Sequence, residues 1–144
     1  MRPADPARVI AAAMAWLGTP YHHQASTQGA GCDCLGLARG VWRALCGAEP
    51  EAPPPYSRDW GETGGRELLR DAARRAMIEV AVDAAGPGAL VLFRMRARGP
   101  AKHCGILLEG GRFIHARERL GVVIHPYDAG WRRRAAFAFH YPER

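Results

Sequence analysis

Apolar residues near the start of the chain recur at intervals of three and four, which is the spacing of one helix face. The residues that follow this spacing are Val9, Ile10, Ala13, Met14 and Leu17. Asp5 and Pro6 come before them and suit an N-cap and a first turn, while Gly18 comes after them and suits a helix end. The pattern predicts a first helix that buries this stripe.

A second stretch with helical spacing runs from Cys34 to Leu45 and is followed by Gly47. Its predicted buried face consists of Leu37, Ala38, Val41, Trp42 and Leu45. Residues Arg66 to Met77 predict a short third helix. The segment 48–65 between these helices holds four prolines, a density that no helix tolerates, so it predicts a long surface loop. Within it, Tyr56 and Trp60 are expected either to line a groove or to cover the core edge.

From Ile78 onward the pattern changes to short apolar runs separated by glycine turns, which is typical of strands. The expected strands are Ile78–Val82, Ala89–Met95, Cys104–Leu108, Arg112–Ala116, Val122–His125 and Ala135–Tyr141. Short links between consecutive strands favour an antiparallel sheet. Because the helices precede the strands, we expect an α+β fold with the N-terminal helices packed on one face of the sheet. A length of 144 residues fits a single domain over 1–144.

The charge balance narrows the classes of partner. A net charge of +6 and a pI near 9.7 favour anionic partners: nucleic acid, a membrane surface, or an anionic polymer such as cell wall. No motif of a nucleic-acid reader is present, so nucleic acid is not expected as a partner. The basic run at 132–134 is more typical of a solvated helix face than of a binding patch. No apolar run approaches the ~18 residues of a membrane span, so no membrane insertion is expected. Asp5 and the lack of a cleavage pattern argue against a signal peptide.

Cys34 is the candidate nucleophile. Asp33 before it is a good N-cap, which places Cys34 in the first turn of the second helix. The positive end of the helix dipole favours a thiolate there, and the thiolate is the reactive form of cysteine. The other cysteines are Cys32, Cys46 and Cys104, and this chain does not have the short, cysteine-dense character of a disulfide framework.

A nucleophile needs a base and a group that orients the base, and His103 and His115 are the best candidates. They lie on neighbouring expected strands joined by a turn at residues 109–111. A two-residue turn at Gly110-Gly111 would place the two histidines on opposite faces of the sheet. A three-residue loop with Gly111 left-handed places them on one face, with His103 opposite Arg117 and His115 opposite Gly105. The triad hypothesis therefore predicts the three-residue loop.

Other interpretations of these residues stay open from the sequence. Cys34 alone could be a small buried hydrophobe, and each histidine alone could be an ordinary strand residue. His22, His23, Cys32 and Cys34 could suggest a metal site. However, Cys-x-Cys lacks the two-residue spacing of zinc knuckles, and the sequence has no second cysteine pair to complete a zinc site. We therefore expect no metal and no cofactor.

Five segments of the chain resemble the NlpC/P60 family of cell-wall cysteine peptidases. They are Thr19-Pro20-Tyr21, Asp33-Cys34-Leu35-Gly36, Gly88–Phe93, His103-Cys104-Gly105-Ile106 and Phe113-Ile114-His115-Ala116, and they occur in the family's order. Gly-Cys-Asp-Cys-Leu-Gly, preceded by Thr-Pro-Tyr-His-His-Gln, is most similar to the branch found in tail modules of phages and of phage-like gene transfer agents. The chain departs from the family pattern at Leu35, Ala89 and 22–24.

The resemblance implies a papain-like core in which Cys34 is the nucleophile, His103 the base and His115 the orienting residue. It implies hydrolysis of amide bonds in peptidoglycan stem peptides, typically between D-glutamate and diaminopimelate. Tyr21, Asp33 and Arg117 are the expected substrate-binding residues. A chain of this kind is expected to be made in the bacterial cytoplasm and to act at the cell wall with phage-like tail-tip proteins. The alternative is a tail-tip plug or adaptor that retains the fold without activity.

Overall fold

The computed structural model describes residues 1–51, 53 and 66–144, so Tyr56 and Trp60, expected to line a groove or to cover the core edge, lie outside the described part. The helices are α1 (Pro6–Met14), α2 (Cys34–Cys46), α3 (Leu68–Ala76) and α4 (Ala129–Arg134). The strands are β1 (Ser26–Thr27), β2 (Gly31–Cys32), β3 (Ile78–Val80), β4 (Leu90–Phe93), β5 (His103–Leu107), β6 (Arg112–Arg117), β7 (Gly121–Pro126) and β8 (Ala135–His140).

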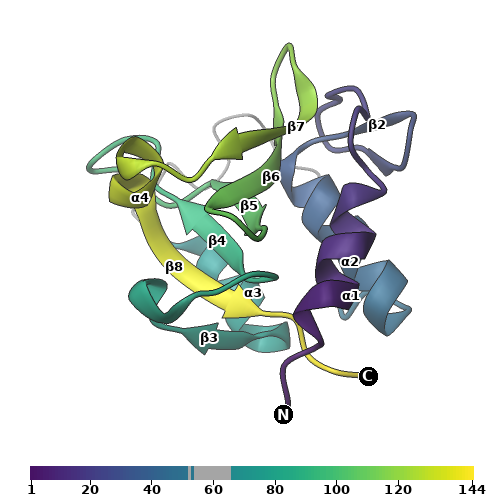
Figure 1. Ribbon diagram of the computed structural model, residues 1–144, viewed down its shortest axis with the longest axis horizontal. Helices are drawn as coiled ribbons and strands as arrows, with labels where there is room; N and C mark the ends of the chain where they lie inside the picture. Colours follow the sequence, from purple (N-terminus) through teal and green to yellow (C-terminus); the bar gives the residue numbers. More distant parts are fainter. Residues whose placement is uncertain (52, 54–65) are drawn as a thin grey trace.

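The main sheet has six strands within the described residues, in the order β3-β8-β4-β5-β6-β7 (Figure 1). Every neighbouring pair in it is antiparallel. Strand β8, the last along the chain, lies between β3 and β4 rather than at an edge. A separate two-stranded ribbon, β1-β2, precedes α2. Together with the N-terminal helices, the sheet confirms the expected α+β architecture.

Helices α1 and α2 lie side by side and cover one face of the sheet (Figure 1). The core between them and the sheet includes Leu37 and Val41 of α2, and Ile106 and Ile114 of the strands, all almost inaccessible to solvent. Burial of such side chains is the main term that stabilises the fold, at roughly 25 cal/mol for each Å² of apolar surface removed from water. The same packing holds α2 against β5 and β6.

The second helix is confirmed almost residue for residue, and Gly47 ends it with a positive φ of 81°. The first helix is shorter than expected. After Met14 the chain tightens, and Leu17 donates to the carbonyl of Met14 three residues back rather than four. This rotates the following side chains, so Trp16 is buried while Met14 and Leu17 are 36% and 48% exposed. The expectation that Met14 and Leu17 complete the buried stripe was therefore wrong.

The turn between β5 and β6 has the three-residue loop that the triad hypothesis predicted. Leu107 pairs with Phe113, and the Leu108 amide donates to the Arg112 carbonyl at 2.8 Å. Gly111 is left-handed at φ 69°, as expected, and Gly110 is left-handed as well. This register places His103 and His115 on the same face of the sheet. A Cβ added to Gly105 would lie 3.1 Å from the His115 Cβ, so the glycine leaves room for that ring.

The opposite face of the sheet carries a smaller aromatic cluster. Phe93, Phe113 and Tyr127 form its buried part, and Trp131 of α4 packs against it. Residues 132–134 end α4 and are exposed, as expected for a solvated helix face. In the described residues, no helix combines the length and the apolar character that crossing a membrane requires.

Candidate active site

The start of α2 is held in place by its own N-cap. The Asp33 carboxylate is buried and accepts from the amides of Gly36 and Gln24, each at 2.7 Å. Gly36 lies against the backbone of Ala25, where an added Cβ would come within 1.9 Å of the carbonyl oxygen. This close approach is possible only for glycine, and it explains why Gly follows two residues after Cys34. The cap confirms the predicted position of Cys34 at the first residue of α2.

Cys34 faces the beginning of β5. Its Sγ lies 3.6 Å from the Lys102 carbonyl oxygen, and the Cys104 thiol donates to the Cys34 carbonyl oxygen at 3.3 Å. An open pocket of about 210 Å³ lies over the sulfur. Its walls are Tyr21, Cys34, His103, Ala116, Arg117 and Glu118. The structure thus brings four of the expected site residues to one pocket: Tyr21, Cys34, His103 and Arg117.

The surroundings of Cys34 lower its thiol pKa well below the ordinary value. The neighbouring Cys104 thiol, which can turn to donate to the Cys34 sulfur, is the largest influence. A hydrogen bond and positive charge at His103 act in the same direction, and burial acts in the opposite one. Burial raises the pKa of Cys32 to about 12, and burial also raises the pKa of Cys46. The pKa of the Cys34 thiol is thus lowered, whereas those of Cys32 and Cys46 are raised.

His103 and His115 form a direct side-chain hydrogen bond. The His103 Nε2 and the His115 Nδ1 are 2.8 Å apart, and the rings meet edge to face at a centroid distance of 5.1 Å. His115 is fully buried, and burial lowers its pKa to about 2, with the positive charges of His103, His125 and Arg117 acting in the same direction. His115 is thus neutral at physiological pH and offers one N–H and one lone pair.

His125 is a third member of this row that the sequence analysis missed. Its Nδ1 lies 2.8 Å from the His115 Nε2. The signal that could have found it is the register of β6 and β7, in which His115 pairs with Val123 and Phe113 with His125. His115 and His125 are therefore diagonal neighbours on one face, a relation in which aromatic side chains reach each other.

The sequence model of the NlpC/P60 family matches residues 18–139, which include the whole of this site. The chain belongs to the NlpC/P60 family. Comparison with curated protein sequences gives no match. The match begins just before Tyr21 and ends within β8, so the family region contains α2, the pocket and the histidine row.

Solved NlpC/P60 structures share the fold. The NlpC/p60 domain of the peptidoglycan hydrolase SagA has a TM-score of 0.66 and 24% identity, and the match covers 94% of this chain and 98% of that domain. An NlpC/P60 family protein from Bacillus cereus has a TM-score of 0.66 and 20% identity over 97% of this chain and 41% of its own. The peptidoglycan hydrolase RipB from Mycobacterium tuberculosis has a TM-score of 0.61 and 19% identity over 96% of this chain and 65% of its own. This chain spans less than two thirds of the latter two proteins.

The expected site residues that remain have other surroundings in this NlpC/P60 chain. The contacts described for Asp33 are those of a helix cap, and it does not line the thiol pocket. His23 lies 4.0 Å from the Asp33 carboxylate, and His22 packs against Gly31. Among residues 1–51, 53 and 66–144, no group of three or more His, Cys, Asp or Glu is placed to hold a metal ion.

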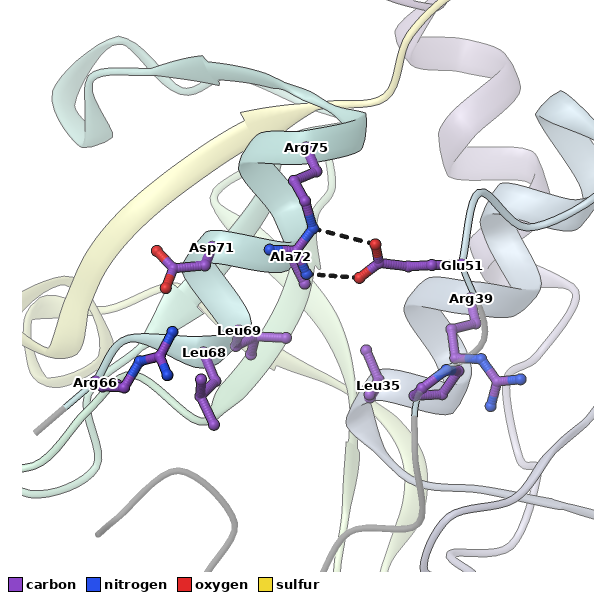
Figure 2. Close-up of a pocket in the computed structure, with 10 residues that line it drawn as sticks. Leu35, Arg39, Glu51, Arg66, Leu68, Leu69, Asp71, Ala72 and Arg75 are labelled. Carbon is purple, nitrogen blue, oxygen red and sulfur yellow. Dashed lines mark hydrogen bonds and ion pairs between the residues drawn. The ribbon is translucent and has the colours of Figure 1, made fainter. Parts of the chain in front are cut away.

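A second pocket, of about 330 Å³, lies between α2 and α3 and has Leu35 in its wall (Figure 2). Arg75 and Glu51 form a bidentate ion pair across it, with distances of 2.6 and 3.1 Å. Pro53 and Arg66, which flank the segment outside the described residues, are part of its wall. It contains neither the thiol nor a histidine, so the chemistry is assigned to the first pocket.

Proposed function

We propose that this chain is a cysteine peptidase that hydrolyses amide bonds in peptidoglycan stem peptides. The observation that carries the proposal is the meeting of Cys34 and His103 at one open pocket, with His115 bonded to the far side of His103. A nucleophile, a base and an orienting group in this order are the components of nucleophilic acyl transfer.

The reaction begins with the Cys34 thiolate, whose proton is held by His103. The sulfur attacks the amide carbonyl carbon, and a C–S bond forms as the carbonyl becomes an oxyanion. The C–N bond then breaks, and His103 gives its proton to the leaving amine. Water attacks the resulting thioester while His103 removes a proton from it, and the carboxylic acid leaves as Cys34 is released. His115 accepts from His103 Nε2–H throughout and keeps the imidazole aligned.

Three groups are proposed to hold the substrate. The Cys34 amide is at the first helical position, where no carbonyl within the helix can accept from it, so it can donate to the oxyanion. Tyr21 lines the same pocket and is proposed as a substrate or oxyanion contact. Asp33 was expected to contact substrate as well, and that part of its role stays a prediction beside its role as a cap.

Arg117 supports an anionic substrate. It lines the pocket, and its guanidinium carbon lies 5.4 Å from the centre of the Trp131 ring, which holds the cation beside the site. Stem peptides carry free carboxylates, and a chain with a net charge of +6 attracts an anionic polymer. SagA and RipB are named as peptidoglycan hydrolases, which agrees with this substrate class. We propose the D-glutamyl–diaminopimelate bond as the target.

The setting in a phage-like tail is a finer part of the proposal. It rests on the resemblance of residues 19–36 to the phage-type branch, with tail-tip proteins as partners and cell-wall penetration as the purpose. The rival from another class is the plug or adaptor without activity. The lowered pKa of the Cys34 thiol favours the peptidase over the adaptor, because strongly shifted pKa values are typical of functional sites.

The decisive experiment is digestion of purified muropeptides, with products identified by mass spectrometry. We expect wild type to release fragments cut after D-glutamate, and Cys34→Ala to release none. Cys46→Ala is the matched control. Cys46 is buried, its thiol donates a hydrogen bond to the Pro142 carbonyl oxygen, and it does not line the Cys34 pocket. Equal products from wild type and Cys34→Ala would reject the mechanism.

Alkylation by iodoacetamide at pH 6 separates the enzyme from the adaptor without any substrate. An activated Cys34 reacts much faster than Cys46, because only a thiolate is alkylated readily. Equal rates at the two cysteines in the folded protein would favour the adaptor.

A further inference from the structure

Both ring nitrogens of His115 are bonded to other histidines. On one side His115 Nδ1 meets His103 Nε2, and on the other His115 Nε2 meets His125 Nδ1, each at 2.8 Å. The three rings come from β5, β6 and β7 and cross edge to face, with centroid distances of 5.1 and 4.9 Å. The row runs from the pocket, where His103 lies, through the fully buried His115 to the half-buried His125.

A neutral His115 can satisfy this row in two ways only. With its proton on Nδ1 it donates to His103 and accepts from His125. With its proton on Nε2 it accepts from His103 and donates to His125. The ionisable and charged groups that act on it are His103, His125 and Arg117, all cationic when charged, so none of them favours a protonated His115.

The proposed chemistry, on which this inference rests, selects one of the two. When His103 holds the proton of Cys34, both of its ring nitrogens carry hydrogen, and its Nε2–H needs an acceptor. Only a His115 with a bare Nδ1 provides one. The His115 proton must then be on Nε2, and something must accept it there.

We propose that His125 is a positioning residue that fixes this tautomer. Its Nδ1 accepts the His115 Nε2–H, which leaves His115 Nδ1 free to accept from His103. His125 touches neither the sulfur nor the pocket, so it acts on the reaction only through His115. The hydrogen bonds among His103, His115 and His125 thus fix the orientation and tautomer of each ring, and no net proton transfer along them is required.

The test uses two variants at one position. His125→Leu keeps an apolar side chain of similar reach and removes the acceptor, whereas His125→Asn keeps an acceptor oxygen near the position of Nδ1. We expect His125→Leu to lower kcat on muropeptides by roughly 10- to 100-fold with little change in KM, the size of loss found when the outer hydrogen-bond partner of a metal-bound histidine is removed. We expect His125→Asn to recover most of that loss. His140→Leu on β8 is the control and should keep wild-type kinetics.

Two readouts distinguish positioning from a merely structural role. The pH profile of Cys34 alkylation should move to higher pH in His125→Leu and return toward wild type in His125→Asn. The ¹⁵N spectrum of wild type should show the His115 proton on Nε2. Unchanged kinetics and profile in a folded His125→Leu would overturn the proposal, as would a wild-type proton on Nδ1 or equal losses in both variants. Alkylation and the spectrum need no substrate, so a failure to cleave muropeptides would reject the proposed function without deciding this inference.

Discussion

At the scale of single residues, the cysteines show how strongly the surroundings of a thiol shift its pKa. Cys32 and Cys34 are two positions apart, yet burial raises the pKa of Cys32 to about 12 while the pKa of Cys34 is lowered. Cys32 belongs to the buried strand β2, whereas Cys34 begins a helix and faces His103 and Cys104. Two cysteines two positions apart therefore have thiol pKa values that are shifted in opposite directions.

Cys104 should control how acidic Cys34 is. Its thiol lies against Cys34 and can turn to donate to the sulfur, which stabilises the thiolate. Cys104→Val keeps the volume and removes the donor. We expect the pH profile of Cys34 alkylation, followed by mass spectrometry, to move to higher pH, and muropeptide turnover at pH 6 to fall.

The control for this substitution is Cys46→Ala, which removes another buried thiol remote from the pocket. It should leave the alkylation profile of Cys34 in place. An unchanged profile in Cys104→Val would show that Cys104 does not lower the pKa of Cys34.

Much of the site follows from local rules. The N-cap places Cys34 at the head of α2, and the loop between β5 and β6 brings His103 and His115 to one face; each is decided within a few residues of sequence. The contributions of His125 and Cys104 were not predicted. They depend on the register of β6 against β7 and on how α2 packs over β5, which are contacts between segments far apart in the chain.

At the scale of elements, the site depends on how tightly α2 approaches the loop before it. Ala25 accepts from the Asp33 amide, and Ser26 Oγ donates to the Gly36 carbonyl at 2.6 Å. Both bonds hold the ribbon against the first turn of α2. Gly36 permits this approach, and it links the conformation of the loop to the position of the Cys34 sulfur.

Gly36→Ala should therefore disturb both stability and reactivity. The new Cβ would lie 1.9 Å from the Ala25 carbonyl oxygen, so backbone must move. We expect a loss of about 1–3 kcal/mol in the free energy of unfolding, the range for overpacking, measured by urea denaturation. Slower alkylation of Cys34 should accompany it, because the first turn of α2 shifts.

Gly130→Ala in α4 is the matched helical control. Its added Cβ meets nothing closer than the Asp128 Oδ1 at 3.4 Å. Helix propensity alone favours alanine by about 0.8–1 kcal/mol, so this variant should be neutral or more stable. A Gly36→Ala protein as stable and reactive as wild type would contradict the role given to the close approach.

The arrangement of elements was only partly predictable. The strand regions emerged from apolar runs and glycine turns, and short links correctly implied antiparallel neighbours. The place of β8 between β3 and β4 was not predicted, because both pairings join segments more than forty residues apart and no local signal encodes them. The early end of α1 was missed for a related reason: burying Trp16 against Gly40 of α2 is a tertiary preference that outweighs helical spacing.

At the scale of the whole molecule, the buried histidine of the row makes the free energy of unfolding depend on pH. His115 is a polar ring among core residues on both sides, fully excluded from solvent and bonded at both nitrogens. Charging such a ring without water is costly. The burial that stabilises the sheet therefore also keeps the His115 ring uncharged.

This burial predicts acid-sensitive folding with a definite sign. The ordinary pKa of histidine is 6.5, and the pKa of His115 in the folded chain is lowered to about 2. Between these values the unfolded chain binds a proton that the folded chain does not, so stability is complete above pH 6.5 and falls as the pH is lowered. The limiting slope for one such group is about 1.4 kcal/mol per pH unit.

Urea denaturation at pH 7, 6 and 5 should show that the free energy of unfolding of His115→Asn falls by about 1 kcal/mol less per pH unit than that of wild type, since asparagine does not titrate. His22→Asn, which removes an exposed ring, should keep the wild-type slope. Equal slopes in wild type and His115→Asn would mean that His115 also becomes protonated in the folded chain, with water or another group stabilising its charge. His115 would then not be the neutral ring between His103 and His125.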